Sequence, residues 1–292
     1  MKKEERNQIR LIKISLKVVK RLLFALTKVK EYLYYELYME QFGFKETDVY
    51  VVTFPKSGTT LTQMMLYQMI SDGSTDFNHI YEVSPWIRND IFKGLPPNLN
   101  LPEPRIIKSH DPYRIFDKRH KGKIIFVIRD GKDALNSLYH QRRSYGLPDL
   151  TFDQFLQQST SNRDSNWFLF NKEWLENKNN FDILYLTYEE ITKNKKETII
   201  KLAQYIGIDQ SKIDIDRVIE KSGFEFMKEH ESKFGEQPPE KKIEMVYDQF
   251  IRKGVAGDGQ KIFNDQQSAF YDQMFQTHIE PLKNQRKLNT LK

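Results

Sequence analysis

The sequence predicts an α/β fold, a single domain in which helices flank a central parallel β-sheet. The first observation is a set of short, apolar, β-branched runs typical of buried strands, at 49–53, 105–108, 123–128 and 182–187. The second is that segments with helical spacing separate these runs, an alternation that favours parallel strands covered on both faces. The third is size, because 292 residues, 39% of them apolar, can enclose one large core.

The elements follow in a regular order along the chain. The strand at 49–53 leads through a turn into a helix at 60–71, and further helices are predicted at 132–143, 151–158, 163–177, 195–206 and 214–221. Residues 77–104 are rich in aromatic side chains and Pro, which favours a loop that lines a binding site. The polar segment 229–249 is predicted to form a mobile loop, and the Gly-rich segment 252–260 an ordered binding loop.

The turn between the first strand and its helix has the composition of a phosphate site. Gly58 permits a bend that other residues resist, and such a loop directs backbone N–H groups to one point at the positive end of the helix dipole. Lys56 adds a mobile cation, and hydroxyl groups come from Ser57, Thr59 and Thr60. The order differs from the Walker A motif because Lys56 precedes Gly58. A plain Gly/Ser/Thr turn is the competing interpretation.

Two further predicted strands end in residues that suit the same chemistry. Arg129 follows the strand at 123–128, and Ser137 lies eight residues later. Lys108 ends the strand at 105–108, and His110 follows it. Ligands of open α/β sheets bind at the carboxyl ends of strands. Each residue alone fits an ordinary surface position, but three such strand ends together predict an anion site with an acid–base group.

Five segments now resemble one family, the sulfotransferases that depend on 3′-phosphoadenosine 5′-phosphosulfate (PAPS), most closely the cytosolic type. In family order, the segments are Phe54–Thr60, Lys108–His110, Arg129–Asp133 with Ser137, Leu184–Ile191 and Arg252–Asp258. The resemblance covers about residues 48–275. It implies a P-loop-like loop that binds the 5′-phosphosulfate, within one sulfotransferase domain at residues 46–292.

The resemblance also implies a role for each site residue. His110 would be the general base, Lys56 would stabilise the leaving oxygen, and Lys108 would support the sulfuryl oxygens. Ser137 would contact both the 3′-phosphate and Lys56. PAPS, with 3′-phosphoadenosine 5′-phosphate (PAP) as product and no metal, would be held by Lys56, Ser57, Gly58, Thr59, Thr60, Leu61, Arg129, Ser137, Tyr188, Ser222, Phe224, Arg252, Lys253 and Gly254.

The sequence departs from the family pattern in three places. Leu61 stands where the family usually has a Trp that helps to hold the adenine, and Gly259 replaces another usual Trp. Both changes bear on cofactor affinity. The family's dimerisation motif would fall on four positions that do not match it, Gln260, Asn264, Asp265 and Ala269. The oligomeric state is therefore left open.

Two other functions compete with sulfuryl transfer. A catalytically silent nucleotide-binding module would explain the two missing Trp residues, but it gives no reason for Lys56, Lys108 and His110 to occur together. A P-loop kinase of small molecules needs Mg²⁺ and a carboxylate at a strand end. Asp130 is the only carboxylate close to the relevant strand ends, and the family has a neutral Asn there.

The partner is expected to be a small-molecule acceptor. Aromatic residues that could line an apolar acceptor pocket are Phe77, Tyr81, Trp86, Tyr113, Tyr139 and Tyr145, although core packing explains each equally well. The acceptor's identity is not readable. The net charge of +6 fits an anionic cofactor, and no nucleic-acid-binding motif accompanies it. The absence of Cys fits a cytoplasmic, reducing location.

Residues 1–45 form a separate basic, amphipathic segment that is predicted to be helical. Leu16, Val19, Leu23, Leu26 and Val29 recur at helical spacing, with Lys and Arg largely between them. These charges interrupt any run long enough to span a membrane. Packing of this helix on the domain is the favoured interpretation, and peripheral contact with an anionic membrane is the alternative.

Overall fold

The computed structural model describes residues 3–116, 120–144, 146–235 and 250–291. Contacts divide the chain into two compact units. The first consists of Met1–Gly43 and Ile87–Leu99, and the second of Phe44–Trp86 and Asn100–Lys292. Packing of the N-terminal segment on the domain remains a prediction.

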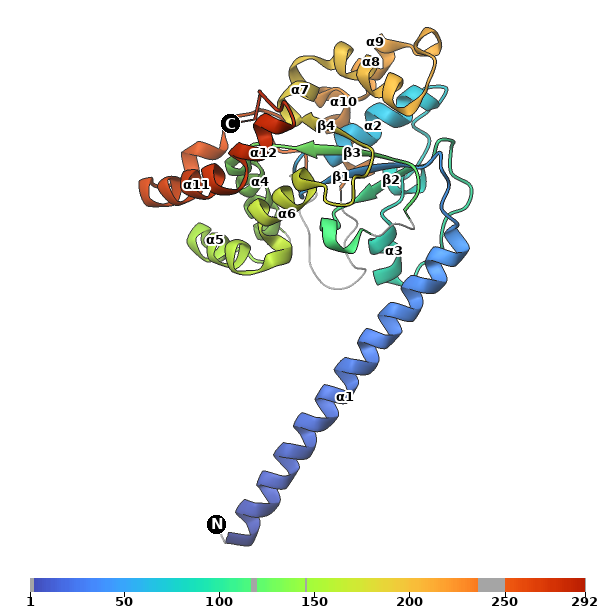
Figure 1. The fold of residues 1–292 in the computed structure, drawn as a ribbon. Coiled ribbons are helices and arrows are strands. Elements are labelled where there is room, and N and C mark those ends of the chain that lie inside the picture. Colours follow the sequence, from blue (N-terminus) through green and yellow to red (C-terminus); the bar gives the residue numbers. More distant parts are fainter. Residues whose placement is uncertain (1–2, 117–119, 145, 236–249, 292) are drawn as a thin grey trace. The chain divides into compact units, whose positions relative to one another are not determined.

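The second unit is built on a parallel sheet that has four strands in the described part of the chain, in the order β2-β1-β3-β4. The strands are β1 (Val49–Thr53), β2 (Ile106–Ser109), β3 (Lys123–Ile128) and β4 (Ile183–Thr187). In the register, Val52 pairs with Ser109 and Phe126, and Ile128 pairs with Thr187. All four carboxyl ends therefore lie along one edge of the sheet (Figure 1).

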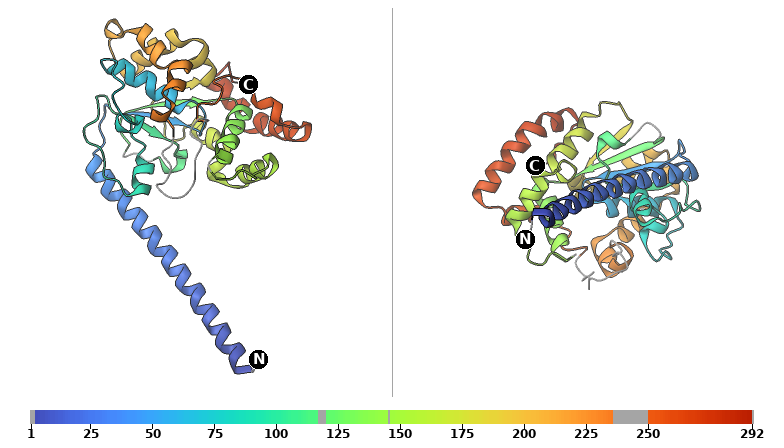
Figure 2. Two further views of the ribbon diagram at one scale, coloured as in Figure 1. Left: turned by 180° about the vertical axis from the view of Figure 1, so that it is seen from behind. Right: turned by 90° about the horizontal axis from the view of Figure 1, so that it is seen from below.

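Helices cover both faces of this sheet (Figure 1 and Figure 2). On one face, Val51 and Ile125 pack into a core with residues of α2 (Thr59–Ile70), α8 (Lys195–Ile206) and α9 (Ile215–Lys221). On the other, the ring of Phe126 stacks on Trp174 of α6 (Trp167–Glu176), with 5.6 Å between centroids. Since β1 and most of β3 are buried on both faces, their near-continuous apolar sequences are what a parallel sheet requires.

The predicted α/β fold is confirmed. The strands at 49–53 and 123–128 and the helix at 195–206 have the predicted bounds. The predicted helix at 163–177 is instead a short turn followed by α6. The remaining helices of this unit are α4 (Gly131–Ser144), α5 (Phe152–Ser161), α7 (Tyr188–Lys193), α10 (Phe224–Glu229), α11 (Asp265–His278) and α12 (Glu280–Gln285).

The first unit joins α1 (Lys3–Phe42) to α3 (Ile87–Lys93). The hydroxyl of Tyr38 donates a hydrogen bond of 3.1 Å to Asp90 Oδ2. The segment 77–104, predicted as one site-lining loop, is therefore divided, because its middle folds as a helix of the first unit. No described helix is long and apolar enough to cross a membrane. Most of the predicted mobile loop, residues 236–249, lies outside the described residues.

Candidate active site

The loop after β1 forms the first wall of the site. Its backbone turns through Lys56 (φ 66°) and Gly58 (φ 97°), and Gly58 is the N-cap of α2. A Cβ at Gly58 would lie 2.7 Å from the ring of Tyr188, so only Gly allows that ring to approach. The hydroxyls of Thr53 and Thr59 lie 2.6 Å apart, which ties the loop to the end of β1.

Ser57 lies inside this turn. Its backbone N–H donates to Phe54 O at 3.2 Å and so closes the turn. Its side chain is fully buried, and none of the described residues forms a hydrogen bond with its Oγ. Burial of an unpaired hydroxyl is unfavourable. Ser57 does not line the cavity described below, so its hydroxyl is not assigned to a ligand.

The end of β2 brings a cation beside an imidazole. Lys108 Nζ donates to Tyr81 Oη at 2.7 Å and lies 4.1 Å from the ring centre of Trp86. The ring of Trp86 also meets His110 edge-on, with 5.3 Å between centroids. His110 Nδ1 lies 2.8 Å from Thr53 O. Because a carbonyl oxygen can only accept, Nδ1 carries the hydrogen and Nε2 is the basic nitrogen.

The electrostatic environment keeps this imidazole neutral. Burial and the positive charges of Lys108 and Lys56 lower the pKa of His110 to about 3, against a smaller opposing effect of its hydrogen bond to Thr53. The lowered value means that the ring is unprotonated at neutral pH. A base with so low a pKa is weak, and the negative charges of a bound PAPS would raise the pKa of His110 toward the range that suits proton transfer.

Arg129, directly after β3, connects three parts of the site. Its guanidinium donates to Lys56 O at 3.1 Å and to Val255 O at 3.2 Å. It also lies 4.4 Å from the ring centre of Tyr188. Its Nε is buried, with no hydrogen-bond partner among the described residues. Arg129 thus links the first loop to a C-terminal loop and retains one buried donor.

The C-terminal loop at residues 250–259 forms the second wall. Phe250 O accepts a hydrogen bond of 3.1 Å from Lys56 Nζ, and the ring of Phe250 lies 4.1 Å below the same ammonium group. Arg252 and Lys253 both pair with the carboxylate of Asp258, at 3.1 and 2.9 Å. The two predicted phosphate-binding cations therefore share one acidic partner of their own loop.

Asp133 on α4 fastens this loop, a role the sequence analysis missed. Its buried carboxylate accepts from the backbone N–H groups of Gly257 at 2.7 Å and Gly259 at 2.6 Å. A Cβ at Gly259 would lie 2.3 Å from the carbonyl carbon of Lys132, so the backbones touch where the family usually has a Trp. The position of Asp133 in the Arg129–Asp133 motif was visible in the sequence, but its contacts 124 and 126 residues away were not.

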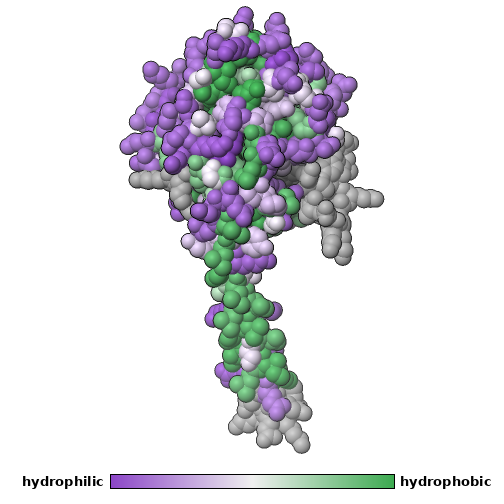
Figure 3. All heavy atoms as spheres, turned by 90° about the vertical axis from the view of Figure 1, so that its right-hand side faces the viewer, coloured by the Kyte–Doolittle hydropathy of each residue, from purple (hydrophilic) through white to green (hydrophobic). Residues whose placement is uncertain are grey.

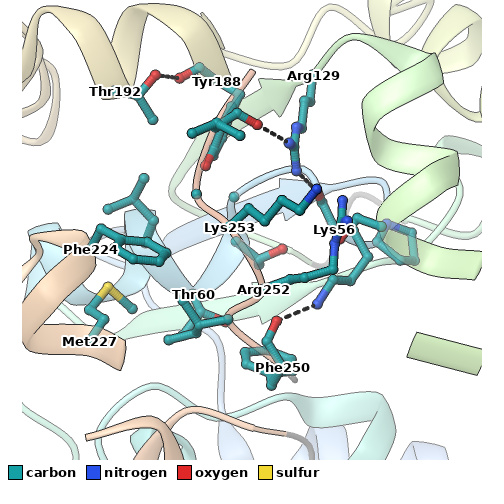
Figure 4. Close-up of a pocket in the computed structure, with 18 of the residues that line it drawn as sticks. Lys56, Thr60, Arg129, Tyr188, Thr192, Phe224, Met227, Phe250, Arg252 and Lys253 are labelled. Atoms are coloured by element: carbon teal, nitrogen blue, oxygen red, sulfur yellow. Dashed lines mark hydrogen bonds between the residues drawn. The ribbon is translucent and has the colours of Figure 1, made fainter. Parts of the chain in front are cut away.

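The two walls enclose a cavity of about 270 Å³ (Figure 4). Every predicted catalytic and cofactor residue except Ser57 lines it. Apolar side chains, including Phe224 and Met227, lie on one side, and the cations Lys56, Arg252 and Lys253 lie toward the other. Lining residues that sequence reasoning missed are Pro55, Gln141, Thr192, Lys195, Met227, Phe250, Ile251 and Val255.

Two of these missed residues could have been found by helical spacing. Gln141 follows Ser137 by four residues on α4, and Thr192 follows Tyr188 by four on α7, so each pair shares a helix face. The Thr192 hydroxyl donates to Tyr188 O at 3.0 Å. For Phe250 and Ile251, the signal was their position directly before Arg252.

The predicted acceptor-pocket residues do not gather in this cavity. Tyr81 and Trp86 contact Lys108, beside the cavity. Phe77 packs in the core against Tyr67 and Phe234. The hydroxyls of Tyr113 and Tyr139 are bound to Asn177 and to Leu150 O. Tyr145 lies outside the described residues.

The residues present fit an adenosine bisphosphate. The cavity combines an apolar side that suits a base with lysines and arginines that suit two phosphates. Arg129 Nε and Arg252 Nε belong to residues that line the cavity, and they are buried donors that no other described residue satisfies. An anionic ligand with many acceptor oxygens would satisfy such donors.

Comparison with known proteins agrees with this geometry. Residues 46–287 match the sulfotransferase domain family. Amine sulfotransferase of Oryctolagus cuniculus is 30% identical over 262 residues, covering 84% of this chain and 85% of that protein. 3-beta-hydroxysteroid sulfotransferase of Cavia porcellus is 30% identical over 252 residues, covering 81% and 85%. Mouse sulfotransferase SULT7A1, solved in complex with PAP, shares the fold with a TM-score of 0.63 at 23% identity, covering 87% of this chain and 93% of that one. Because the family match extends over most of the sequence, the chain belongs to the sulfotransferase domain family and is, as predicted, a PAPS-dependent sulfotransferase.

Proposed function

We propose that the protein transfers the sulfuryl group of PAPS to a hydroxyl or amine of a small, apolar or aromatic acceptor, with His110 as general base. The observation that carries this proposal is the orientation of His110. Its Nδ1–H is held by Thr53 O at 2.8 Å, so that Nε2 is the atom that accepts a proton. A lowered pKa keeps that atom unprotonated.

The remaining residues divide the work of binding and charge stabilisation. PAPS, when bound, supplies the sulfuryl group that is transferred. Lys56 is assigned to the leaving oxygen, because it is the cation of the strand–helix loop that faces the cavity. Lys108 is assigned to the sulfuryl oxygens. Its position beside His110 is fixed by the Tyr81 hydroxyl and the Trp86 ring, which makes Tyr81 and Trp86 positioning residues.

The other end of the cavity would hold the nucleotide. Arg129, Ser137, Arg252, Lys253 and the amide of Gly254 would bind the 3′-phosphate, with Gly58, Thr59 and Thr60 on the 5′-phosphate. Phe224 and Tyr188 would contact the adenine. A Cβ at Gly254 would lie 2.3 Å from the Phe224 ring, so this Gly allows the ring to lie directly against the loop.

The acceptor class is supported by relatives. Two proteins at 30% identity are named for an amine and for a 3β-hydroxysteroid. One acceptor is an amine and the other is a hydroxyl on an apolar steroid frame, and we extend this range of nucleophiles, but no single compound, to this chain. A cytoplasmic location remains a prediction.

Transfer of ³⁵S-labelled sulfuryl groups from PAPS to a phenol, a sterol and an apolar amine tests the proposal. We expect transfer to at least one of them, together with a rise in melting temperature on addition of PAP. A PAP-induced rise with no transfer to any acceptor would support the silent nucleotide-binding module. A rise with ATP and Mg²⁺ but not with PAP would support a kinase, although Asp130 is engaged in accepting a hydrogen bond from the amide of Asp133.

A further inference from the structure

Helix α1 carries an apolar face that the first unit leaves exposed. Large apolar side chains project from it along its length, and Figure 3 shows them as a green band. Leu11, Leu22 and Leu26 are 64%, 59% and 64% exposed. Burial of such side chains is favourable by the hydrophobic effect, so a continuous exposed row of them indicates a surface that binds something.

The apolar and basic side chains occupy separate faces of α1 between Ile9 and Val29. At about 100° per residue, the apolar residues cover an arc of roughly 200°. This apolar face consists of Ile9, Leu11, Ile12, Ile14, Leu16, Val18, Val19, Leu22, Leu23, Leu26 and Val29. The basic face covers roughly 100° and consists of Arg10, Lys13, Lys17, Lys20, Arg21 and Lys28. Phe24 alone interrupts the basic face, and its ring is contacted by Lys28 at 5.7 Å.

The charge of this stretch has one sign. Residues 9–29 include six Lys and Arg and no Asp or Glu, although the whole chain has 40 acidic residues. The next acidic residue is Glu31, which pairs with Lys28. A helix with a broad apolar face and an unbalanced basic face is complementary to a surface that is apolar inside and anionic outside.

We propose that α1, from Ile9 to Val29, lies in the plane of an anionic lipid bilayer. The apolar face would enter the boundary between head groups and acyl chains, and the basic face would contact the lipid phosphates and carboxylates. The helix would lie on the membrane without crossing it, since charges recur along its whole length and no described helix meets the requirements for a span.

A second copy of the chain fits this face less well. Ile12, Leu16, Val19, Leu23 and Leu26 do follow the alternating spacing of a coiled coil. A two-stranded seam, however, is narrower than the apolar arc. It would leave Leu11, Ile14, Val18 and Leu22 in water. A bilayer covers the whole arc, and it also provides the negative charge that a second copy of this basic helix lacks.

Attachment would have a consequence for catalysis. If the acceptor is apolar, as the proposed function holds, it accumulates in membranes, and an attached enzyme would meet it there. The attachment itself rests only on α1 and does not depend on the proposed function. The two can therefore fail separately.

Vesicle co-sedimentation of the full-length protein tests the attachment. We expect binding to phosphatidylcholine vesicles that contain phosphatidylserine, and roughly tenfold weaker binding to phosphatidylcholine alone or in high salt. Lys13→Glu/Lys17→Glu/Arg21→Glu should abolish binding. Leu22→Ser/Leu26→Ser should also abolish it, without any change of charge.

A matched control carries the same change of charge elsewhere. Lys196→Glu/Lys201→Glu/Lys212→Glu reverses three exposed cations of the second unit and should bind vesicles as the wild type does. If this control loses binding as well, net charge and not α1 is responsible, and the proposal is wrong.

Two further measurements distinguish the bilayer from the two other surfaces that could cover the apolar face, a second copy of the chain and the protein's own domain. A dimer in sedimentation equilibrium that becomes a monomer in Leu22→Ser/Leu26→Ser, with no vesicle binding by the wild type, would replace the bilayer with a second copy. A large loss of melting temperature in the same variant, again without vesicle binding, would mean that α1 packs on its own domain. PAP binding by all variants shows that the catalytic domain is intact in each case.

Discussion

The two walls of the cavity are built in different ways. The first loop and the residues at the ends of β2 and β3 directly continue buried strands, so their positions are determined by the core. The loop at 250–259 has no strand or α-helix within it before the short turn at Gly259–Ile262. Hydrogen bonds to Asp133, Arg129 and Lys56 hold this loop in place.

This difference suggests that the two walls have different functions. The first wall, here called the strand-end wall, carries the groups assigned to chemistry, Lys56, Lys108 and His110, whose geometry must be accurate. The second wall, here called the loop wall, consists of residues 250–259 and carries Arg252 and Lys253, which are assigned to nucleotide binding. Changes to the first wall should lower turnover, whereas changes to the second should weaken nucleotide binding and leave turnover at saturation nearly unchanged.

The largest effect is expected at His110. His110→Ala removes the proposed base from the strand-end wall and should lower kcat by roughly two to four orders of magnitude, while the Kd for PAP stays close to that of the wild type. Steady-state transfer and PAP titration calorimetry measure the two quantities. His278→Ala, a histidine of α11 outside the cavity, is the matched control and should leave both unchanged. Unchanged turnover in His110→Ala would remove His110 as base.

The next largest effect is expected at Asp133, whose two hydrogen bonds to the loop wall we call the clamp. Asp133→Asn replaces a carboxylate that accepts two backbone hydrogen bonds with an amide that can accept only one of them well. Since hydrogen bonds to charged groups contribute about 1.5–3 kcal/mol each, the Kd for PAP should rise by roughly ten- to a hundredfold. The kcat at saturating PAPS should fall much less.

Asp272→Asn is the control for the clamp. It changes the same residue type on an exposed side chain whose ion pair with Lys132 lies beside α4. Its PAP affinity should match the wild type. If Asp133→Asn lowered kcat and left Kd unchanged, the loop wall would not be a separate binding element.

A smaller effect is expected from the contact between the two backbones at Gly259. In Gly259→Ala, the new Cβ would collide with the backbone of Lys132 and Asp133, at 2.3 and 2.4 Å, and should displace the loop. We expect about a tenfold rise in the Kd for PAP. Gly257→Ala is the matched control, since no atom lies within 4 Å of its Cβ and only the strain of its positive φ of 89° is added. Equal losses in the two variants would contradict the close contact.

The two walls also differ in how well the sequence predicted them. The strand-end wall was predictable, because its residues lie at or shortly after the ends of apolar, β-branched runs and parallel strands end at one edge. The clamp was not, because Asp133 and Gly259 are 126 residues apart and no local pattern joins them. Ser57 shows a further limit, because a motif match does not reveal that its amide donates within its own turn or that its side chain lies away from the cavity.

A gain of affinity is expected at Leu61, which lines the cavity beside the N-terminal turn of α2. Leu61→Trp would restore the aromatic residue usual in the family and should lower the Kd for PAP by roughly two- to tenfold through ring stacking. Leu61→Met keeps the apolar volume without a ring and should have no effect. A weaker affinity in Leu61→Trp would show that this chain holds the adenine in a different way.

The smallest effect is expected when kcat/KM is measured as a function of pH. The measurement tests whether the residues of the strand-end wall determine the pKa of His110. A histidine with an ordinary pKa near 6.5 would lose about tenfold in unprotonated fraction between pH 7.5 and 5.5. Burial and Lys108 lower the pKa of His110 to about 3, so the neutral form persists throughout this range. The kcat/KM, which reports the free enzyme, should therefore change by less than about twofold. Melting temperatures across the range exclude unfolding as a cause. Asp133→Asn should have the same flat profile, because its carboxylate acts on the loop wall and not on the imidazole. An acid limb near pH 6.5 in the wild type would mean that His110 lies in a more open environment than its contacts with Trp86, Thr53 and Lys108 provide.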